Sequence, residues 1–153
     1  MAIRHIRVDE RLVHGQVASA WSNTVEANRI MVINDAANGD EFAKKMLRMA
    51  TPSQIALSVL TIEKAITRIG AGQYDNDRVL VIFKSISDAL EARNQGFKFE
   101  KINIGNSSSK DTQTPIAKGI YINSEDQKAI DELKSQGVKV TVQMTPADGT
   151  IKL

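Results

Sequence analysis

The chain has 153 residues, of which 42% are hydrophobic and 25% charged, and its formal net charge is +2. This length and composition fit one globular domain, 1–153, that can bury a core, and the near-neutral charge argues against a nucleic-acid binder that depends on a basic surface. The absence of cysteine excludes disulfides, thiolate metal sites and cysteine nucleophiles, and it fits a reducing cytoplasm.

The first half of the chain alternates short apolar runs with segments of helical periodicity. The apolar runs predict four strands, over residues 3–8, 29–34, 55–60 and 79–83. The periodic segments predict three helices, which start near residue 15, after the start signals at 38–40 and at the Thr61 cap. Trp21, Met46 and Met49 lie on helix faces that we expect to be buried.

The second half repeats this alternation. It begins with a predicted helix over 85–96, followed by strands over 102–105 and 116–122 on either side of a polar loop at 106–114. A helix over 124–137 and a strand over 138–142 complete it. Ser85 or Ser87 caps the first of these helices. Ser124 and Gln127 have the spacing of a capping box for the second. The tail after Pro146 is expected to be irregular.

Repeated strand–helix units predict an α/β fold. We expect three α/β/α layers, with a mostly parallel central sheet of six to seven strands and helices on both faces. Ligands of such sheets bind beyond the carboxyl ends of the strands, at a switch point in the strand order. The turn after the first strand is therefore the first place to search for chemistry.

That turn reads Arg-Val-Asp-Glu-Arg-Leu-Val-His-Gly-Gln-Val. His14 directly precedes a helix, whose dipole favours a neutral, nucleophilic imidazole and whose free N–H groups attract anions. Arg7 and Arg11 are candidates to clamp phosphate oxygens. Asp9 is a candidate to orient Arg11 or to hold the imidazole tautomer, and Gly15 leaves room for a tetrahedral group. These residues together predict transient phosphorylation of His14.

Each of these residues also has a simpler interpretation. A histidine in a surface turn is commonly just a polar turn residue, and Asp9 can be an ordinary partner of the helix dipole. His5 lies inside the first strand, where a satisfied structural role is expected. Ser85 and Ser87 are most simply helix caps, although a capped helix start at the carboxyl edge of the sheet also contacts anions, so both are candidate phosphate-binding residues.

Other chemical motifs are missing from the sequence. It contains neither the glycine-rich loops of nucleotide-binding proteins nor the Gly-x-Ser-x-Gly elbow of hydrolases. Two widely separated histidines form no persuasive metal set. The N-terminus lacks the apolar run of a signal peptide, and no stretch approaches the roughly 18 apolar residues of a membrane span, so no membrane insertion is expected.

The turn, with Trp21 following it, closely resembles the active-site signature of IIB subunits in the mannose/fructose/sorbose family of the sugar phosphotransferase system. That signature reads Arg-Ile-Asp-Asp/Glu-Arg-Leu-Ile-His-Gly-Gln-Val, and Val8 and Val13 replace its isoleucines here. The resemblance continues at residues 34–35, 102–106, 116–118 and 131–138, and so spans essentially the whole chain. The segment Ile-Asn-Ile-Gly-Asn and the short tail look similar to galactosamine- and N-acetylgalactosamine-type members.

The resemblance implies a protein-N(pi)-phosphohistidine–sugar phosphotransferase without a metal or organic cofactor. A IIA domain would donate a phosphoryl group to His14, and the chain would pass it to a sugar that the membrane subunits IIC and IID import. Arg11 would stabilise the phosphoryl group, with Asp9 nearby. The resemblance also implies a cytoplasmic protein recruited to the inner face of the membrane through the transporter subunits. The sugar and any homo-oligomer stay open.

The family fold also implies that the first strand lies between the fourth and fifth strands. The helix start at 85–88 and the loop at 105–114 would then flank His14, and this loop is expected to be less ordered than the core. Two functions from other classes remain. A small hydrolase or isomerase with His14 as general base would need no phosphodonor, whereas a non-catalytic binding module would tolerate loss of the imidazole.

Overall fold

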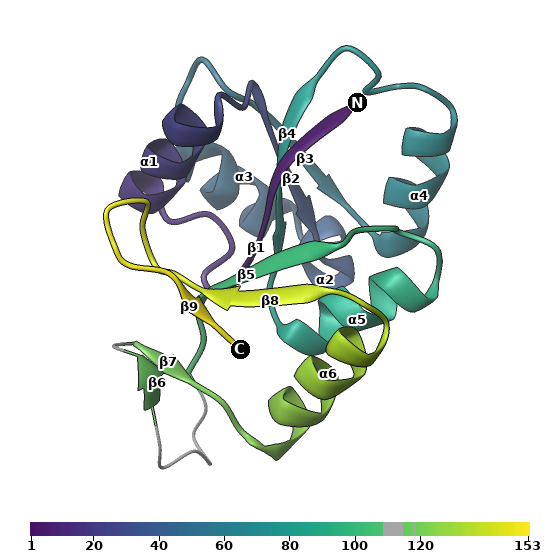
Figure 1. Ribbon diagram of the computed structural model, residues 1–153. Coiled ribbons are helices and arrows are strands. Elements are labelled where there is room, and N and C mark those ends of the chain that lie inside the picture. Colours follow the sequence, from purple (N-terminus) through teal and green to yellow (C-terminus); the bar gives the residue numbers. More distant parts are fainter. Residues whose placement is uncertain (109–114, 118) are drawn as a thin grey trace.

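The computed structural model describes residues 1–108, 115–117 and 119–153 (Figure 1). Its central sheet contains the strands β1 (Ala2–Asp9), β2 (Arg29–Ile33), β3 (Ala56–Leu60), β4 (Arg78–Phe83), β5 (Lys101–Asn106), β8 (Lys139–Val142) and β9 (Ile151–Lys152). The strand order is β3-β2-β4-β1-β5-β8-β9, and neighbours are parallel except for β8 and β9. The prediction that β1 lies between the fourth and fifth strands is confirmed.

Helices cover both faces of this sheet, which confirms the predicted three-layer α/β/α architecture (Figure 1). The described helices are α1 (Gly15–Val25), α2 (Asp35–Asn38), α3 (Glu41–Ala50), α4 (Ile62–Gly70), α5 (Ile86–Asn94) and α6 (Ser124–Ser135). The first three share a buried cluster on one face of the sheet. The last three share a larger cluster on the opposite face. Within the described residues, no helix is both long and apolar enough to cross a bilayer.

The central position of β4, covered on both faces, explains why its sequence is apolar without alternation. Val79, Val81 and Phe83 belong to the larger cluster, whereas Leu80 and Ile82 belong to the smaller one on the other face. Successive side chains of a strand point to opposite faces, so a strand covered on both sides needs apolar residues at every position.

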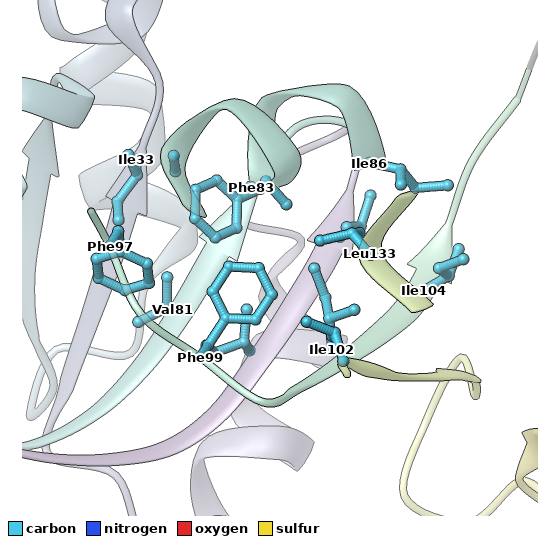
Figure 2. Close-up of a cluster of buried hydrophobic side chains, with 14 of the residues drawn as sticks. Ile33, Val81, Phe83, Ile86, Phe97, Phe99, Ile102, Ile104 and Leu133 are labelled. Carbon is cyan, nitrogen blue, oxygen red and sulfur yellow. The ribbon is translucent and has the colours of Figure 1, made fainter. Parts of the chain in front are cut away.

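Aromatic rings fill the centre of the larger core (Figure 2). The rings of Phe83 and Phe97 meet edge to face with centroids 5.9 Å apart, and Phe99 packs 6.3 Å from Phe83. Such offset and edge-to-face contacts are favoured because the edge of one ring is positive and the face of the other negative. This packing joins the carboxyl end of β4 to the segment that leads into β5.

Two helix starts refine the sequence prediction. Of the two serines proposed as the cap of α5, Ser85 is the cap, because its hydroxyl accepts the Asp88 N–H at 3.1 Å. The box that opens α6 is formed by Asn123 and Asp126, one position before the predicted pair. The sequence offers two overlapping polar pairs three residues apart, and the helix uses the pair that contains the carboxylate and the asparagine.

The burial of α3 was predicted wrongly. Trp21 is buried as expected, but Met46 and Met49 are exposed, and Leu47 is the α3 side chain that enters the core. Ala43 and Ala50 are half-buried on the same side of the helix as Leu47. Since residues 46 and 49 lie on a different side of a helix from residue 47, seating Leu47 turns both methionines outward.

The segment 116–122 was predicted as one strand of the central sheet, and this was wrong. The structure has a short antiparallel pair there, β6 (Pro115–Ala117) and β7 (Ile120–Tyr121), in a sheet of its own. Gly119 lies between them with φ +76°, a left-handed conformation that glycine adopts without a steric penalty. The glycine therefore allows the chain to reverse.

The tail after Pro146 was predicted to be irregular, but residues 151–152 form β9. This strand pairs antiparallel with β8, so that Thr141 faces Lys152, and it covers the edge that β8 would otherwise expose. The prediction of lower order in the loop 105–114 concerns residues 109–114, which lie outside the described residues.

Candidate active site

The turn that carries the signature lies at the carboxyl edge of the sheet. Val8 of β1 is paired with Phe83 of β4 and with Ile104 of β5, so these strands end side by side. The start of α5, two residues after β4, and Asn106, the last residue of β5, therefore flank the turn. This is the arrangement of neighbouring segments that the expected strand order implied.

The turn itself contains a strained residue. The Leu12 N–H donates to the Asp9 carbonyl at 2.9 Å and closes the turn. Leu12 has φ +62°, in the left-handed region, where a residue with a Cβ costs roughly 1–2 kcal/mol. Packing of Leu12 against the cluster under α1 and α3 helps to hold this conformation, and the strain lies two residues before His14.

Asp9 is the centre of the turn, because its carboxylate is 1% exposed and accepts four hydrogen bonds. Its Oδ1 accepts the Arg11 backbone N–H at 2.9 Å and Arg11 Nε at 3.0 Å. Its Oδ2 accepts Arg11 Nη2 at 3.0 Å and Arg7 Nη2 at 3.2 Å. Of the two roles predicted for Asp9, this geometry favours orienting Arg11, through a two-pronged contact that fixes the guanidinium plane.

Arg7 was predicted to bind phosphate, but the geometry contradicts a direct contact. Its side chain is 2% exposed, and its Nη1 donates to the backbone carbonyls of Met144 at 2.8 Å and Gln143 at 3.3 Å. Burial lowers the pKa of Arg7, and the neighbouring carboxylate of Asp9 opposes that effect. Arg7 points under the turn, where it supports Asp9, because residues 7 and 9 share one face of the strand.

Gly105 makes room for this buried guanidinium. A Cβ built on Gly105 would overlap the Arg7 guanidinium. Gly105 is buried within β5, next to the strand that carries Arg7. Gly105 was predicted as the last residue of a strand and the first of the flanking loop, and this role was not predicted, although a glycine inside a strand often marks the close approach of another group.

His14 is exposed at the end of the turn. It is the N-cap of α1, with φ −111° and ψ +115°, and its side chain makes no capping hydrogen bond. Its imidazole therefore stands at the helix start without closing the helix. Gly15 is also exposed, and a Cβ there would meet only the Ala50 carbonyl, at 3.5 Å. The space that Gly15 leaves for a tetrahedral group remains a prediction.

His5, the other histidine, is in a different environment. Its ring stacks on Trp21 with centroids 4.1 Å apart. Burial, and secondarily the charge of Arg7, lowers the pKa of His5 to about 4. The expectation that its polar atoms are satisfied is wrong for Nε2, which is buried without a hydrogen-bond partner in the described part of the chain. Its role is packing, as the sequence predicted.

The segment after β5 is tied to the turn through Glu10. The Glu10 carboxylate accepts the Ser108 N–H at 3.1 Å and its hydroxyl at 2.7 and 2.8 Å. On the other flank, the Ser85 hydroxyl is occupied by its cap contact and Ser87 is exposed on the first turn of α5. Binding of phosphate by these two serines remains a prediction. The Glu10–Ser108 link was not predicted, because the two residues are 98 positions apart.

The arrangement combines a free imidazole with a fixed cation. Arg11 is 34% exposed, so one side of its guanidinium faces solvent while the other is held by Asp9. The start of α1 adds backbone N–H groups that favour an anion. Within the residues that the structure describes, no cluster of histidine or carboxylate side chains is placed to hold a metal. A site of this kind suits transfer of an anionic group to His14.

Gly105→Ala tests whether the Arg7 guanidinium needs the space that Gly105 leaves beside it. The added methyl group should displace the guanidinium and weaken its contacts with Asp9, so we expect a loss of about 3 kcal/mol in the free energy of unfolding. Urea denaturation measures this loss. Gly149→Ala is the matched control, since a Cβ there meets nothing within 4 Å. Equal midpoints for the two variants would show that Arg7 is not confined by Gly105.

Known proteins resemble this chain along its whole length. The family model described as "PTS system sorbose subfamily IIB component" matches residues 3–153. The sorbose-specific EIIB component of Klebsiella pneumoniae is 31% identical over 153 residues, covering 100% of this chain and 93% of that protein. The N-acetylgalactosamine-specific phosphotransferase enzyme IIB component 2 of Escherichia coli K12 is 31% identical over 147 residues, covering 96% and 93%.

Solved structures show the same fold. The crystal structure of the IIBSor domain of the sorbose permease from Klebsiella pneumoniae superposes with a TM-score of 0.90 at 31% identity, covering 99% of this chain and 93% of that one. The N-acetylgalactosamine-specific IIB component 1 from Escherichia coli gives a TM-score of 0.91 at 27% identity, with 99% of each chain covered. The chain therefore belongs to the sorbose-type IIB family of the sugar phosphotransferase system, and it is a IIB component, a phosphocarrier in sugar uptake.

Proposed function

We propose that His14 is the residue of this IIB component that carries the phosphoryl group. The observation that supports this most is the exposed imidazole at the start of α1, which makes no capping hydrogen bond and lies three residues after Arg11. Asp9 holds Arg11 in one orientation, so its cationic edge is in place before an anion arrives. Preorganised charge of this kind lowers the barrier of phosphoryl transfer.

Two transfers follow from this assignment. In the first, the N–P bond of a phosphohistidine on a IIA domain breaks as one imidazole nitrogen of His14 bonds to phosphorus. The proton on the other ring nitrogen of His14 is lost and the donor histidine takes up a proton, so both rings are neutral after the transfer. In the second, a sugar hydroxyl attacks the same phosphorus, the N–P bond on His14 breaks, and the hydroxyl proton balances the proton that the His14 ring takes up, which regenerates the neutral imidazole. Arg11 neutralises charge on the phosphoryl oxygens in both steps, and the helix start of α1 contributes N–H groups.

The partners follow from the same chemistry. The donor is a IIA domain, and the acceptor is a sugar presented by the membrane subunits IIC and IID. We propose that 1–153 works as a single IIB domain in the cytoplasm and is recruited to the inner face of the membrane by those subunits. The sorbose-specific and N-acetylgalactosamine-specific relatives are equally identical to this chain, at 31%, so the galactosamine-type assignment stays a prediction.

His14→Ala should produce a folded protein that accepts no phosphate. The variant removes the exposed nucleophile, whereas His5→Phe, the control, keeps an aromatic ring on Trp21 and should accept normally. The measurement is intact mass after incubation with a phosphorylated IIA domain, read as the gain of one phosphoryl group. Acid-labile phosphate on His14→Ala at wild-type levels would remove His14 from the mechanism. Turnover of a small substrate without any phosphodonor would favour a hydrolase or isomerase.

Arg11→Lys should slow transfer more than it affects folding. Lysine keeps a positive charge near Asp9 but loses the planar fork that contacts both carboxylate oxygens. We expect the single-turnover rate of transfer from phosphorylated IIA to fall about tenfold or more, with a stability loss of about 1 kcal/mol. Arg4→Lys, at an exposed position of β1, is the control and should match wild type. A wild-type rate for Arg11→Lys would show that the fork is not used.

A further inference from the structure

Helix α3 exposes a stripe of three large apolar side chains. Phe42 is 72% exposed, Met46 49% and Met49 79%. Their spacing of four and three residues places them on one side of the helix. Single exposed apolar residues are ordinary on a protein surface, but several on one face of one helix are typical of a surface that contacts another protein. The three residues are called the α3 stripe below.

The α3 stripe adjoins the turn that carries His14. Met49 directly precedes Ala50, whose carbonyl oxygen lies 3.5 Å from the position of a Cβ on Gly15. Val13, just before His14, and Leu47 of α3 belong to the same buried cluster. The carboxyl end of α3 therefore packs against the start of α1, and this contact fixes the stripe relative to the imidazole.

We propose that the α3 stripe is the surface on which the IIA phosphodonor domain docks. The proposal rests on His14 as the acceptor, because a donor histidine must then approach the start of α1. A typical interface covers roughly 800 Å² of each partner, equivalent to a disc of about 16 Å radius. The ten residues of α3 extend about 15 Å. Since the carboxyl end of α3 packs beside the start of α1, a donor centred on His14 reaches α3 within that radius.

Charges beside the stripe define the partner further. Lys45 and Arg48 are both exposed on α3, next to the apolar side chains. Arg48 donates hydrogen bonds to three backbone carbonyls but keeps its charge, and the Glu41 carboxylate beside Phe42 is paired with Lys44. The matching surface on the donor is an apolar patch with acidic residues at its rim, because interfaces place opposite charges across from each other. A second copy of this chain is a weaker match, because a symmetric interface would place the same cations of the two copies near one another. Thioether and aromatic side chains are also common anchors in interfaces.

The test uses Phe42→Ser, Met46→Ser and Met49→Ser in the full chain. The donor is the phosphorylated IIA domain that labels His14 of the wild-type protein, and the transfer rate is measured against donor concentration. We expect KM for the donor to rise about tenfold in at least two variants, as for truncated interface anchors, while the rate at saturating donor stays within about twofold. Ile3→Ser is the control, because Ile3 is 36% exposed at the amino end of β1, the far end of that strand from the turn.

A charge variant provides a second, independent measurement. Lys45→Glu should slow transfer at low ionic strength and approach the wild-type rate at high salt, because salt screens contacts between exposed charges. Since all five substituted side chains are exposed, unchanged melting temperatures are expected and show that the variants are folded.

The outcomes separate this proposal from the acceptor assignment. If wild type and all three serine variants have the same KM, the docking proposal fails while His14 remains the acceptor. If the wild-type protein gains no phosphate from any IIA domain, the proposed function fails first. If the serine variants accept phosphate from IIA at the normal rate but pass it slowly to sugar in transporter vesicles, the stripe contacts the membrane subunits instead. That result would overturn the proposal. A wild-type dimer that the variants dissociate would overturn it in favour of self-association.

Discussion

The buried carboxylate of Asp9 is the interaction on which the site depends. A charge that is 1% exposed is stable only when it is paired and hydrogen-bonded. Here two guanidinium groups share it: Arg7 from below and Arg11 from the solvent side. Because Arg7 is buried and hydrogen-bonded to two backbone carbonyls as well as to Asp9, the orientation of Arg11 is set by the interior of the protein.

The alternation of β1 makes this arrangement compatible with a folded core. Ile6 and Val8 point into the larger cluster under α4, α5 and α6. Arg7 and Asp9 point to the opposite face, towards α1, where the Arg7 guanidinium lies 5.8 Å from the Trp21 ring. One strand therefore contributes both to the apolar core and to the ion-paired base of the site.

The backbone after β8 completes that base. The Met144 carbonyl accepts hydrogen bonds from Arg7 at 2.8 Å and from the Trp21 indole at 3.0 Å. Gly105 leaves the space that the Arg7 guanidinium occupies. Segments from the start, middle and end of the chain thus meet beneath the turn. A substitution in any of them is expected to alter the orientation of Arg11, because Arg7 and Asp9 connect these segments to it.

The features that short stretches of sequence encode could be predicted. The strands, the helix starts and the signature around His14 each depend on residues within about a dozen positions, so periodicity and capping rules apply to them. The role of Arg7 could not be obtained this way, because its carbonyl partners are 136 and 137 positions away. The orientation of α3 was missed for a related reason: Leu47 and the two methionines are equally apolar, and only tertiary packing decides which enters the core.

A double-mutant cycle on transfer tests most directly whether Asp9 acts through Arg11. Asp9→Asn, Arg11→Ala and the double variant are compared by single-turnover transfer from phosphorylated IIA, with thermal melting to confirm that each is folded. If Asp9 serves to position Arg11, the Asp9→Asn substitution slows transfer when Arg11 is present. In the Arg11→Ala protein, the same substitution changes the transfer rate by less than about twofold. Equal slowing in both backgrounds would mean that Asp9 acts on the reaction independently of Arg11, and it would contradict this account.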